Sequence, residues 1–181
     1  MKEGIAYTGI PSAEELSSCA GIPTRERMAK GPVAVIECIQ CIPCNPCEMA
    51  CPTGAISLGG AISNAPKLDG DKCIGCGKCV ARCPGQAITV LNMAYSADKA
   101  TLDFPYEFLP LPAEGDTVRA VNRAGAPVCE AAVLSVRNPL TVVDGAVLSA
   151  LAGKIGILVA THANGRAAEG AQHGIKPAFL I

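Results

Sequence analysis

The sequence predicts an α+β protein with three parts: an N-terminal helical arm over residues 1–31, a cysteine-rich unit over residues 32–104, and a small, mostly antiparallel β domain over residues 105–181. Two observations indicate this division. Four cysteines, a proline and an Ala-Ile pair recur at the same spacing 32 residues later; the first copy is Cys41, Cys44, Cys47, Cys51-Pro52 and Ala55-Ile56. Almost no cysteine follows Ala94. The middle part therefore consists of two copies of one unit, each a cysteine loop, a short helical turn and a strand.

Helix signals are clearest in the arm. Ser12 and Glu15 have capping-box spacing and predict a helix over residues 13–18. Thr24 predicts the start of a second helix that runs to Lys30 and is ended by Gly31 and Pro32. The arm shows no chemistry of its own, so its expected role is structural.

Strands follow from short apolar runs between turn residues. In the cysteine-rich unit we expect them at residues 33–36, 56–58 and 88–94. In the C-terminal part we expect them at residues 101–104, 116–123, 128–137 and 155–161, with a final helix from Asn164 toward Gln172. Pro105, Pro110 and Pro112 indicate a hinge before the β domain.

The composition excludes some classes of protein. Charged residues make up 17% of the 181 residues and hydrophobic residues 50%, so the chain has enough apolar content to fold. It has few charged side chains to hydrate its surface. We therefore expect a partner to cover part of the surface. The formal net charge of -1 and the absence of a Lys/Arg run exclude a typical nucleic-acid-binding protein.

Localisation follows from the first residues, which include Lys2 and Glu3 and have no apolar signal region, so we expect a cytoplasmic protein. Clustered cysteines in that compartment indicate metal or redox chemistry more often than disulfides. The longest apolar run, residues 146–163, is interrupted by Lys154 and indicates buried strands, not a membrane span.

Eight of the eleven cysteines form two consecutive runs with the spacing C-x2-C-x2-C-x3-C-P. The first three cysteines of such a run lie on one tight loop and can bind one face of a cuboidal 4Fe-4S cluster, whose fourth iron needs a ligand from elsewhere. A zinc ribbon is the alternative, but zinc sites usually use two separated C-x2-C pairs for one ion. A disulfide-rich domain fits the cytoplasm less well still.

These two runs resemble the bacterial-type dicluster ferredoxin family over about residues 33–94. The resemblance implies a repeated β-α-β fold, two 4Fe-4S clusters and one-electron transfer, with the fourth cysteine of each run binding the cluster of the other. For cluster I the implied ligands are Cys41, Cys44, Cys47 and Cys83. For cluster II they are Cys73, Cys76, Cys79 and Cys51.

Three cysteines fall outside this ligand set. Cys38 lies three residues before Cys41, so a register of Cys38, Cys41, Cys44 and Cys47 is possible. That register would leave Cys51 without a role although Pro52 marks it as a ligand, and we interpret Cys38 as a non-ligand near cluster I. Cys19 and Cys129 are isolated and are expected to be buried apolar side chains.

No catalytic constellation is recognisable. His162 and His173 have no partner motif, and the sequence has no GxGxxG or P-loop pattern for a flavin, nicotinamide or nucleotide. The active centre is therefore expected on another polypeptide. The low charge and the additional N- and C-terminal parts, which carry no chemistry of their own, favour a non-catalytic electron-transfer subunit of a larger oxidoreductase.

Residues 31–38 and 42–48 are also similar to the small iron-sulfur subunits that accompany FAD-dependent dehydrogenases of the proline, hydroxyproline or related amine type. That resemblance implies a hetero-oligomer with a flavin-dependent dehydrogenase subunit and an electron acceptor, with FAD or FMN on that partner subunit only. Electrons would then flow from substrate to the flavin and on through the clusters. Two alternatives stay open: a freely diffusing ferredoxin that serves several clients, and a cluster-based redox sensor or scaffold.

The two cluster loops differ in backbone donors and in charge. Pro43 and Pro46 remove two N–H groups from the first loop, whereas Gly75 and Gly77 keep theirs in the second. Glu37 and Glu48 stand near the first loop, and around the second Lys72, Lys78 and Arg82 outnumber Asp69 and Asp71. Because donors and cations stabilise a reduced cluster, we expect cluster II to have the higher reduction potential.

Overall fold

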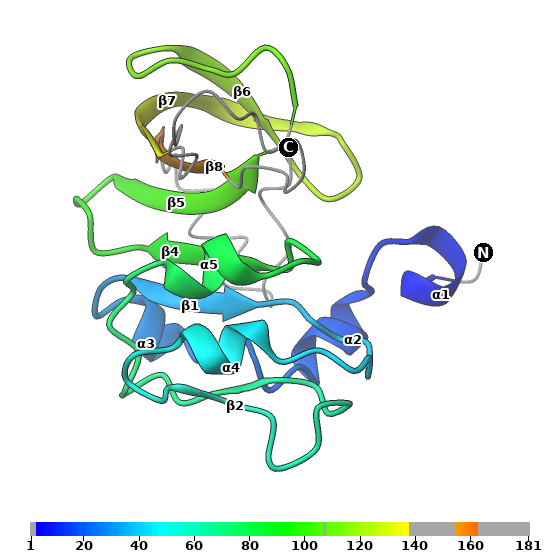
Figure 1. Ribbon diagram of the computed structural model, residues 1–181. Helices are drawn as coiled ribbons and strands as arrows, with labels where there is room; N and C mark the ends of the chain where they lie inside the picture. The colour runs from blue at the N-terminus through cyan, green and yellow to red at the C-terminus, as the bar shows by residue number, and fades with distance from the viewer. Residues whose placement is uncertain (1–2, 107, 138–154, 163–181) are drawn as a thin grey trace, which may run out of the picture.

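The computed structural model describes residues 3–106, 108–137 and 155–162, and shows short helices combined with two antiparallel sheets (Figure 1). Six strands form one sheet in the order β1-β4-β5-β8-β7-β6, and β2 and β3 form a second. The larger sheet contains β1 (Val33–Ile36), β4 (Ile88–Asn92), β5 (Lys99–Tyr106), β6 (Thr117–Val121), β7 (Pro127–Arg137) and β8 (Ile155–His162). The expected helix from Asn164 and the side chain of His173 lie outside the described residues.

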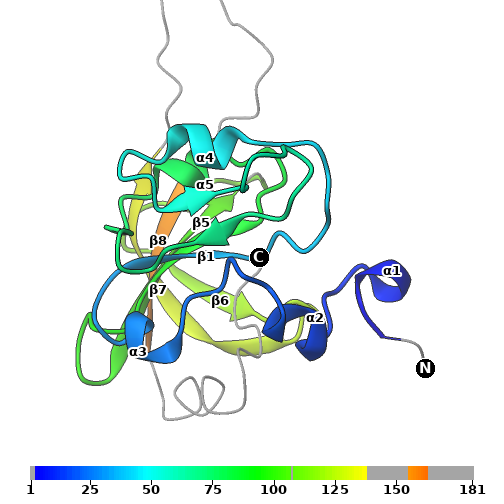
Figure 2. The ribbon, with the colours of Figure 1, turned by 90° about the horizontal axis from the view of Figure 1, so that it is seen from below.

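Three short helices form the N-terminal arm: α1 (Ile5–Thr8), α2 (Ala13–Ser17) and α3 (Arg25–Met28). The capping box of α2 is confirmed, since the Ser12 N–H donates to the Glu15 carboxylate at 2.7 Å and the Glu15 N–H donates to Ser12 Oγ at 3.2 Å. Thr24 caps α3 through its Oγ1, which accepts from the Arg27 N–H. Viewed from below, α1 lies further from the sheet than α2 does (Figure 2).

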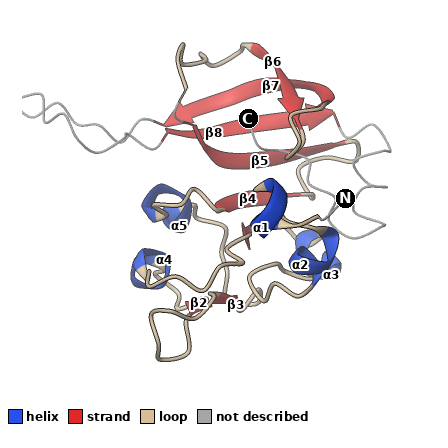
Figure 3. Ribbon diagram, turned by 90° about the vertical axis from the view of Figure 1, so that its right-hand side faces the viewer, coloured by secondary structure: helices blue, strands red, loops and turns tan. Residues whose placement is uncertain are grey.

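The repeated unit consists of α4 (Pro46–Ala50), β2 (Ile56–Ser57), β3 (Lys67–Leu68) and α5 (Lys78–Arg82), together with β1 and β4. The helices α4 and α5 lie on one side of β4, and the N-terminal helices lie on the other (Figure 3). Strand β1 pairs with β4 from Val33 opposite Leu91 to Ile36 opposite Ile88. The helices α4 and α5 lie over one side of the β1–β4 strand pair (Figure 3).

Of the three prolines expected to form a hinge, Pro105 does not belong to one. Pro105 lies inside β5, opposite Gly156 of β8, and is buried. Strand β5 pairs with β4 on one side and with β8 on the other, so one sheet continues from the cysteine-rich part into the C-terminal strands. The boundary expected between residues 104 and 105 falls within this strand. None of the helices in the described ranges is long and apolar enough to cross a membrane.

Candidate iron-sulfur site

The two cysteine runs fold alike. In each, the third cysteine lies in a short helix and is buried: Cys47 in α4 and Cys79 in α5. The fourth cysteine ends that helix with nearly the same backbone angles, φ -77° and ψ 111° at Cys51, and φ -73° and ψ 112° at Cys83. A proline follows each of these cysteines and excludes the helical conformation from the residue before it. The sequence repeat is therefore also a structural repeat.

The fourth cysteines receive matching hydrogen bonds. The Ala55 N–H donates to Cys51 Sγ at 3.2 Å, and the Ala87 N–H donates to Cys83 Sγ at 3.4 Å. Each bond joins a cysteine to the residue four positions later, just before a strand. Such donors stabilise negative charge on sulfur, which a thiolate ligand carries.

One pocket brings Cys51 together with the second cysteine loop. The residues that line it include Cys51, Cys73, Cys76 and Cys79, together with the apolar residues Ala34, Ile56 and Val90. Cys51 therefore shares a pocket with cysteines of the other run. No three cysteine, histidine, aspartate or glutamate side chains within the described ranges are arranged to hold a single metal ion. A cuboidal cluster is wider than one ion, so its four ligands need not converge on a point.

Cys83 lies near the first run. Burial raises the pKa of the Cys47 thiol, and the neighbouring sulfurs of Cys83 and Cys44 raise it further. Burial also raises the pKa of Cys79 to about 12, with Cys73 and Cys76 adding to the effect. Iron binding must therefore remove protons from these buried thiols, because thiolate is the ligand form. Cys41 and Cys76, one in each loop, are exposed.

An apolar core separates these sulfurs from water on the side of the sheet. It is built from residues of β1, β2, α5 and β4: Ala34, Ile36, Ile56, Val80, Ile88 and Val90. Cys47 and Cys79 belong to this core, and Cys51, Cys73 and Cys83 pack against it. The environment can hold a cluster in a low dielectric, where each N–H donor and charge has more effect than in water.

The second loop depends on close contact with β1. Gly75 has φ +64°, and a Cβ there would lie 2.6 Å from the Pro32 side chain and 2.8 Å from its carbonyl group. The Ala34 N–H, from β1, donates to Cys73 Sγ at 3.4 Å. Only glycine permits both the left-handed backbone and this approach. The sequence did not reveal the Ala34 donor, because pairing between distant segments leaves no local pattern.

The three cysteines outside the two runs lie in different parts of the fold. Cys38 packs against the same core, and its pKa is raised by burial first and then by the sulfurs of Cys83, Cys47 and Cys44. Cys19 is half-buried and its thiol donates to the Ile36 carbonyl at 3.3 Å. Cys129 is half-buried in β7. Cys38 is therefore near cysteines of the first run. Cys19 and Cys129, which were expected to be buried, are only half-buried.

Residues 40–87 match the family model described as a 4Fe-4S dicluster domain. The matched range contains all eight cysteines of the two runs and excludes Cys38. No curated protein and no solved structure matched the chain. The matched domain and its cysteine arrangement imply two [4Fe-4S] clusters, so the chain binds metal and transfers electrons through iron-sulfur clusters.

Proposed function

We propose that the two clusters exchange their fourth ligands. Cluster I is bound by Cys41, Cys44, Cys47 and Cys83, and cluster II by Cys73, Cys76, Cys79 and Cys51. The observation that carries this assignment is the pocket that Cys51 lines together with the three cysteines of the second loop. The nearness of Cys83 to Cys44 and Cys47 supports the reciprocal half. The family match, which begins after Cys38, supports Cys41 as the first ligand.

The chain's residues supply binding, insulation and electrostatic tuning. The eight cysteines hold the iron, and the N–H groups of Ala34, Ala55 and Ala87 donate to the sulfurs of Cys73, Cys51 and Cys83. The core of β1, β4 and α5 keeps water from one side of the site. When bound, each cluster supplies reversible one-electron chemistry. Exposed Cys41 and Cys76 mark the edges at which a redox partner can approach most closely.

We further propose that this chain is the electron-transfer subunit of a larger oxidoreductase, relaying electrons between a flavin-containing dehydrogenase subunit and another acceptor. The C-terminal strands support this, because they extend the sheet well beyond the cluster-binding part. The segment after β5 also exposes large apolar side chains: Phe108, Leu109 and Leu111, with Leu109 85% exposed. Exposed apolar side chains gathered in one segment are typical of a surface that a partner covers.

Native purification tests the relay proposal. The chain, expressed with a small tag in its own cells and isolated without oxygen, should elute from size exclusion in a fixed ratio with a flavin-containing protein, and iron and flavin should co-elute. A fully loaded monomer that reduces several unrelated acceptors would instead establish the freely diffusing ferredoxin. Loss of partner binding on cluster removal would favour the sensor.

A truncation tests the role of the C-terminal strands. Deleting residues 111–181 should leave the visible cluster absorbance, because the proposed ligands and their core lie before residue 93. The same deletion should release the chain from its complex. Loss of both clusters would make the C-terminal strands part of the cluster-binding core and would contradict a docking role.

A further inference from the structure

A buried ion pair joins the C-terminal strands to the segment that precedes the first cysteine loop. Arg123, in the turn between β6 and β7, donates through Nε to Glu37 Oε2 at 2.8 Å and through Nη2 to Glu37 Oε1. The Arg123 side chain is only 4% exposed and that of Glu37 is 20% exposed. These residues are 86 positions apart, so the contact depends on the whole fold.

The turn holds Arg123 in a fixed place. Asn122 accepts through its side-chain oxygen from the N–H groups of Ala124 and Ala126, at 3.0 and 2.9 Å. The Asn122 N–H donates to the Ala126 carbonyl at 2.8 Å, and Gly125 adopts φ +76° to close the turn. Arg123 therefore projects from a turn fixed by several hydrogen bonds.

Glu37 connects this cation to a proposed ligand of cluster I. Its N–H donates to the Ala87 carbonyl at 2.8 Å, and the Ala87 N–H donates in turn to Cys83 Sγ at 3.4 Å. On its other side, Glu37 is followed by Cys38, which packs against the core containing Cys47. Through Glu37 the ion pair is thus connected to the segment that precedes the first run and, by way of Ala87, to Cys83.

The ion pair with Glu37 does not use every N–H group of the Arg123 guanidinium. Within the described residues, Arg123 Nη1 is buried and has no hydrogen-bond partner. Burial lowers the pKa of Arg123 to about 10, which still keeps the guanidinium charged at neutral pH. A buried cation that shares one carboxylate and retains a free N–H favours additional negative charge nearby. A cluster gains one negative charge when it is reduced, which provides that charge.

We propose that Arg123 raises the reduction potential of cluster I, so that the turn between β6 and β7 acts as an electrostatic tuning element for the first cysteine loop. This inference rests on the proposed ligation of cluster I by Cys83. Arg123 is a positioning residue in this role: it binds no iron and acts through its fixed charge and through Glu37. Removing its charge should destabilise the reduced form of cluster I more than that of cluster II.

A potentiometric EPR titration of the full chain, with dithionite as reductant, tests the proposal. Arg123→Gln should lower the midpoint potential of one signal, and Arg123→Lys should return it toward the parent value. Glu37→Gln, which keeps the cation and removes the anion, should raise the same potential. The affected signal should be the one that Cys44→Ser removes and Cys76→Ser spares.

Arg119→Gln is the matched control, because Arg119 is an exposed arginine on β6, close to the same turn. It should leave both potentials unchanged. An equal shift with Arg119→Gln, an unshifted Arg123→Gln protein, or a shift confined to the other signal would overturn the inference. If Arg123→Gln does not fold, an unchanged potential in Glu37→Gln overturns it. Iron content near four per chain in the parent would contradict the proposed function instead.

Discussion

Cys38 is the residue whose role the structure sharpens most. It lies near Cys44, Cys47 and Cys83, although it is outside the matched domain. We predict that Cys38→Ala retains about eight irons per chain, because the two runs already supply eight ligands. The matched Cys41→Ala variant should lose iron from cluster I. Iron analysis with visible absorbance of anaerobic protein measures both.

An iron count near four in Cys38→Ala, with a full count in Cys41→Ala, would make Cys38 the ligand. The spacing of the first run would then begin three residues earlier than proposed.

Substitutions at Gly75 and Gly77 allow the cost of backbone strain to be measured apart from the cost of a steric collision. Both have positive φ, +64° and +72°, but a Cβ at Gly77 meets no atom within 4 Å, whereas one at Gly75 would collide with Pro32. Gly77→Ala should cost about 1–2 kcal/mol of folding free energy from the left-handed backbone alone. Gly75→Ala should cost more and should also weaken cluster II, because it displaces the start of β1 and the Ala34 donor.

Urea unfolding and iron content of the two variants measure this difference. Equal losses of stability and iron would show that the contact between Gly75 and Pro32 has no role in holding the second loop.

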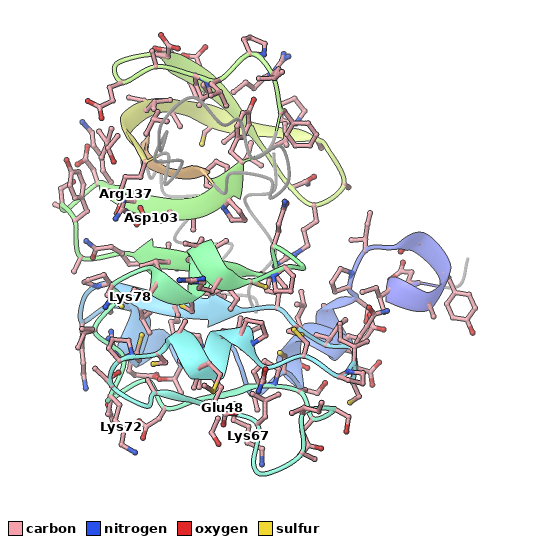
Figure 4. All side chains as sticks on the ribbon, viewed as in Figure 1. Glu48, Lys67, Lys72, Lys78, Asp103 and Arg137 are labelled. Atoms are coloured by element: carbon pink, nitrogen blue, oxygen red, sulfur yellow. The ribbon has the colours of Figure 1, made fainter. Side chains whose placement is uncertain are left out.

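At the scale of elements, the end of β7 stabilises a buried carboxylate in β5. Arg137 Nη2 donates to Asp103 Oδ2 at 2.7 Å, and the two side chains lie together beside β5 (Figure 4). Asp103 Oδ1 is buried without a partner in the described ranges. Burial raises the pKa of Asp103 above 3.8, against the lowering effect of Arg137. The folded state therefore holds this proton more tightly than the unfolded state does.

The raised pKa of Asp103 predicts that the free energy of unfolding depends on pH. The contribution of Asp103 to stability is complete below its ordinary pKa and is lost as pH rises through the raised pKa. Arg137→Met removes the compensating cation, so its cost should grow as pH rises through the raised pKa of Asp103 and should reach about 1–2 kcal/mol once Asp103 is ionised, given the exposure of Arg137. Arg119→Met is the exposed control, and denaturant midpoints in acid and at neutral pH measure the effect. A cost that falls with rising pH would contradict it.

Elements with local signals could be predicted from the sequence. The capping residues Ser12 and Thr24 start α2 and α3 as expected, and the apolar run of residues 33–36 forms β1. The helix α1 and the two-residue strand β3 were missed, since neither has a strong cap or an apolar run. Pro105 was misinterpreted because it lies beyond Asp103, the last residue of β5 that pairs with β4, so β5 pairs only with β8 there and tolerates a proline as a sheet edge does.

Long-range pairing could not be predicted. Strand β8 inserts between β5 and β7, and Arg123 reaches Glu37 from across the chain. Such contacts depend on where whole elements pack, and the sequence carries no local pattern for them. The repeat is the exception, because two similar segments that pack on one another make their contacts predictable by symmetry.

For the whole molecule, the two clusters should differ in potential. The structure corrects the charge count made from the sequence, because Arg123 pairs with Glu37 and Lys72 pairs with Asp69 at 3.0 Å. Glu48 then remains near the first loop in sequence, and Lys78 and Arg82 outnumber Asp71 near the second. The Ala34 N–H adds a donor to Cys73. We therefore predict that cluster II is reduced first.

Stepwise reduction followed by EPR measures this order. The first signal to appear should vanish in Cys76→Ser and persist in Cys44→Ser. The opposite pattern would mean that Arg123 and the unknown partner surface outweigh the donors of the second loop.

The exchange of fourth ligands is the central claim, and Cys51→Ser tests it most directly. Cys51 is adjacent to the first loop in sequence but shares its pocket with Cys73, Cys76 and Cys79. EPR spectra of the reduced Cys51→Ser protein should therefore show the same altered or missing signal as Cys76→Ser and should keep the signal that Cys44→Ser removes. If Cys51→Ser instead matches Cys44→Ser and spares the cluster of the second loop, each run binds its own cluster and the proposed ligation is wrong.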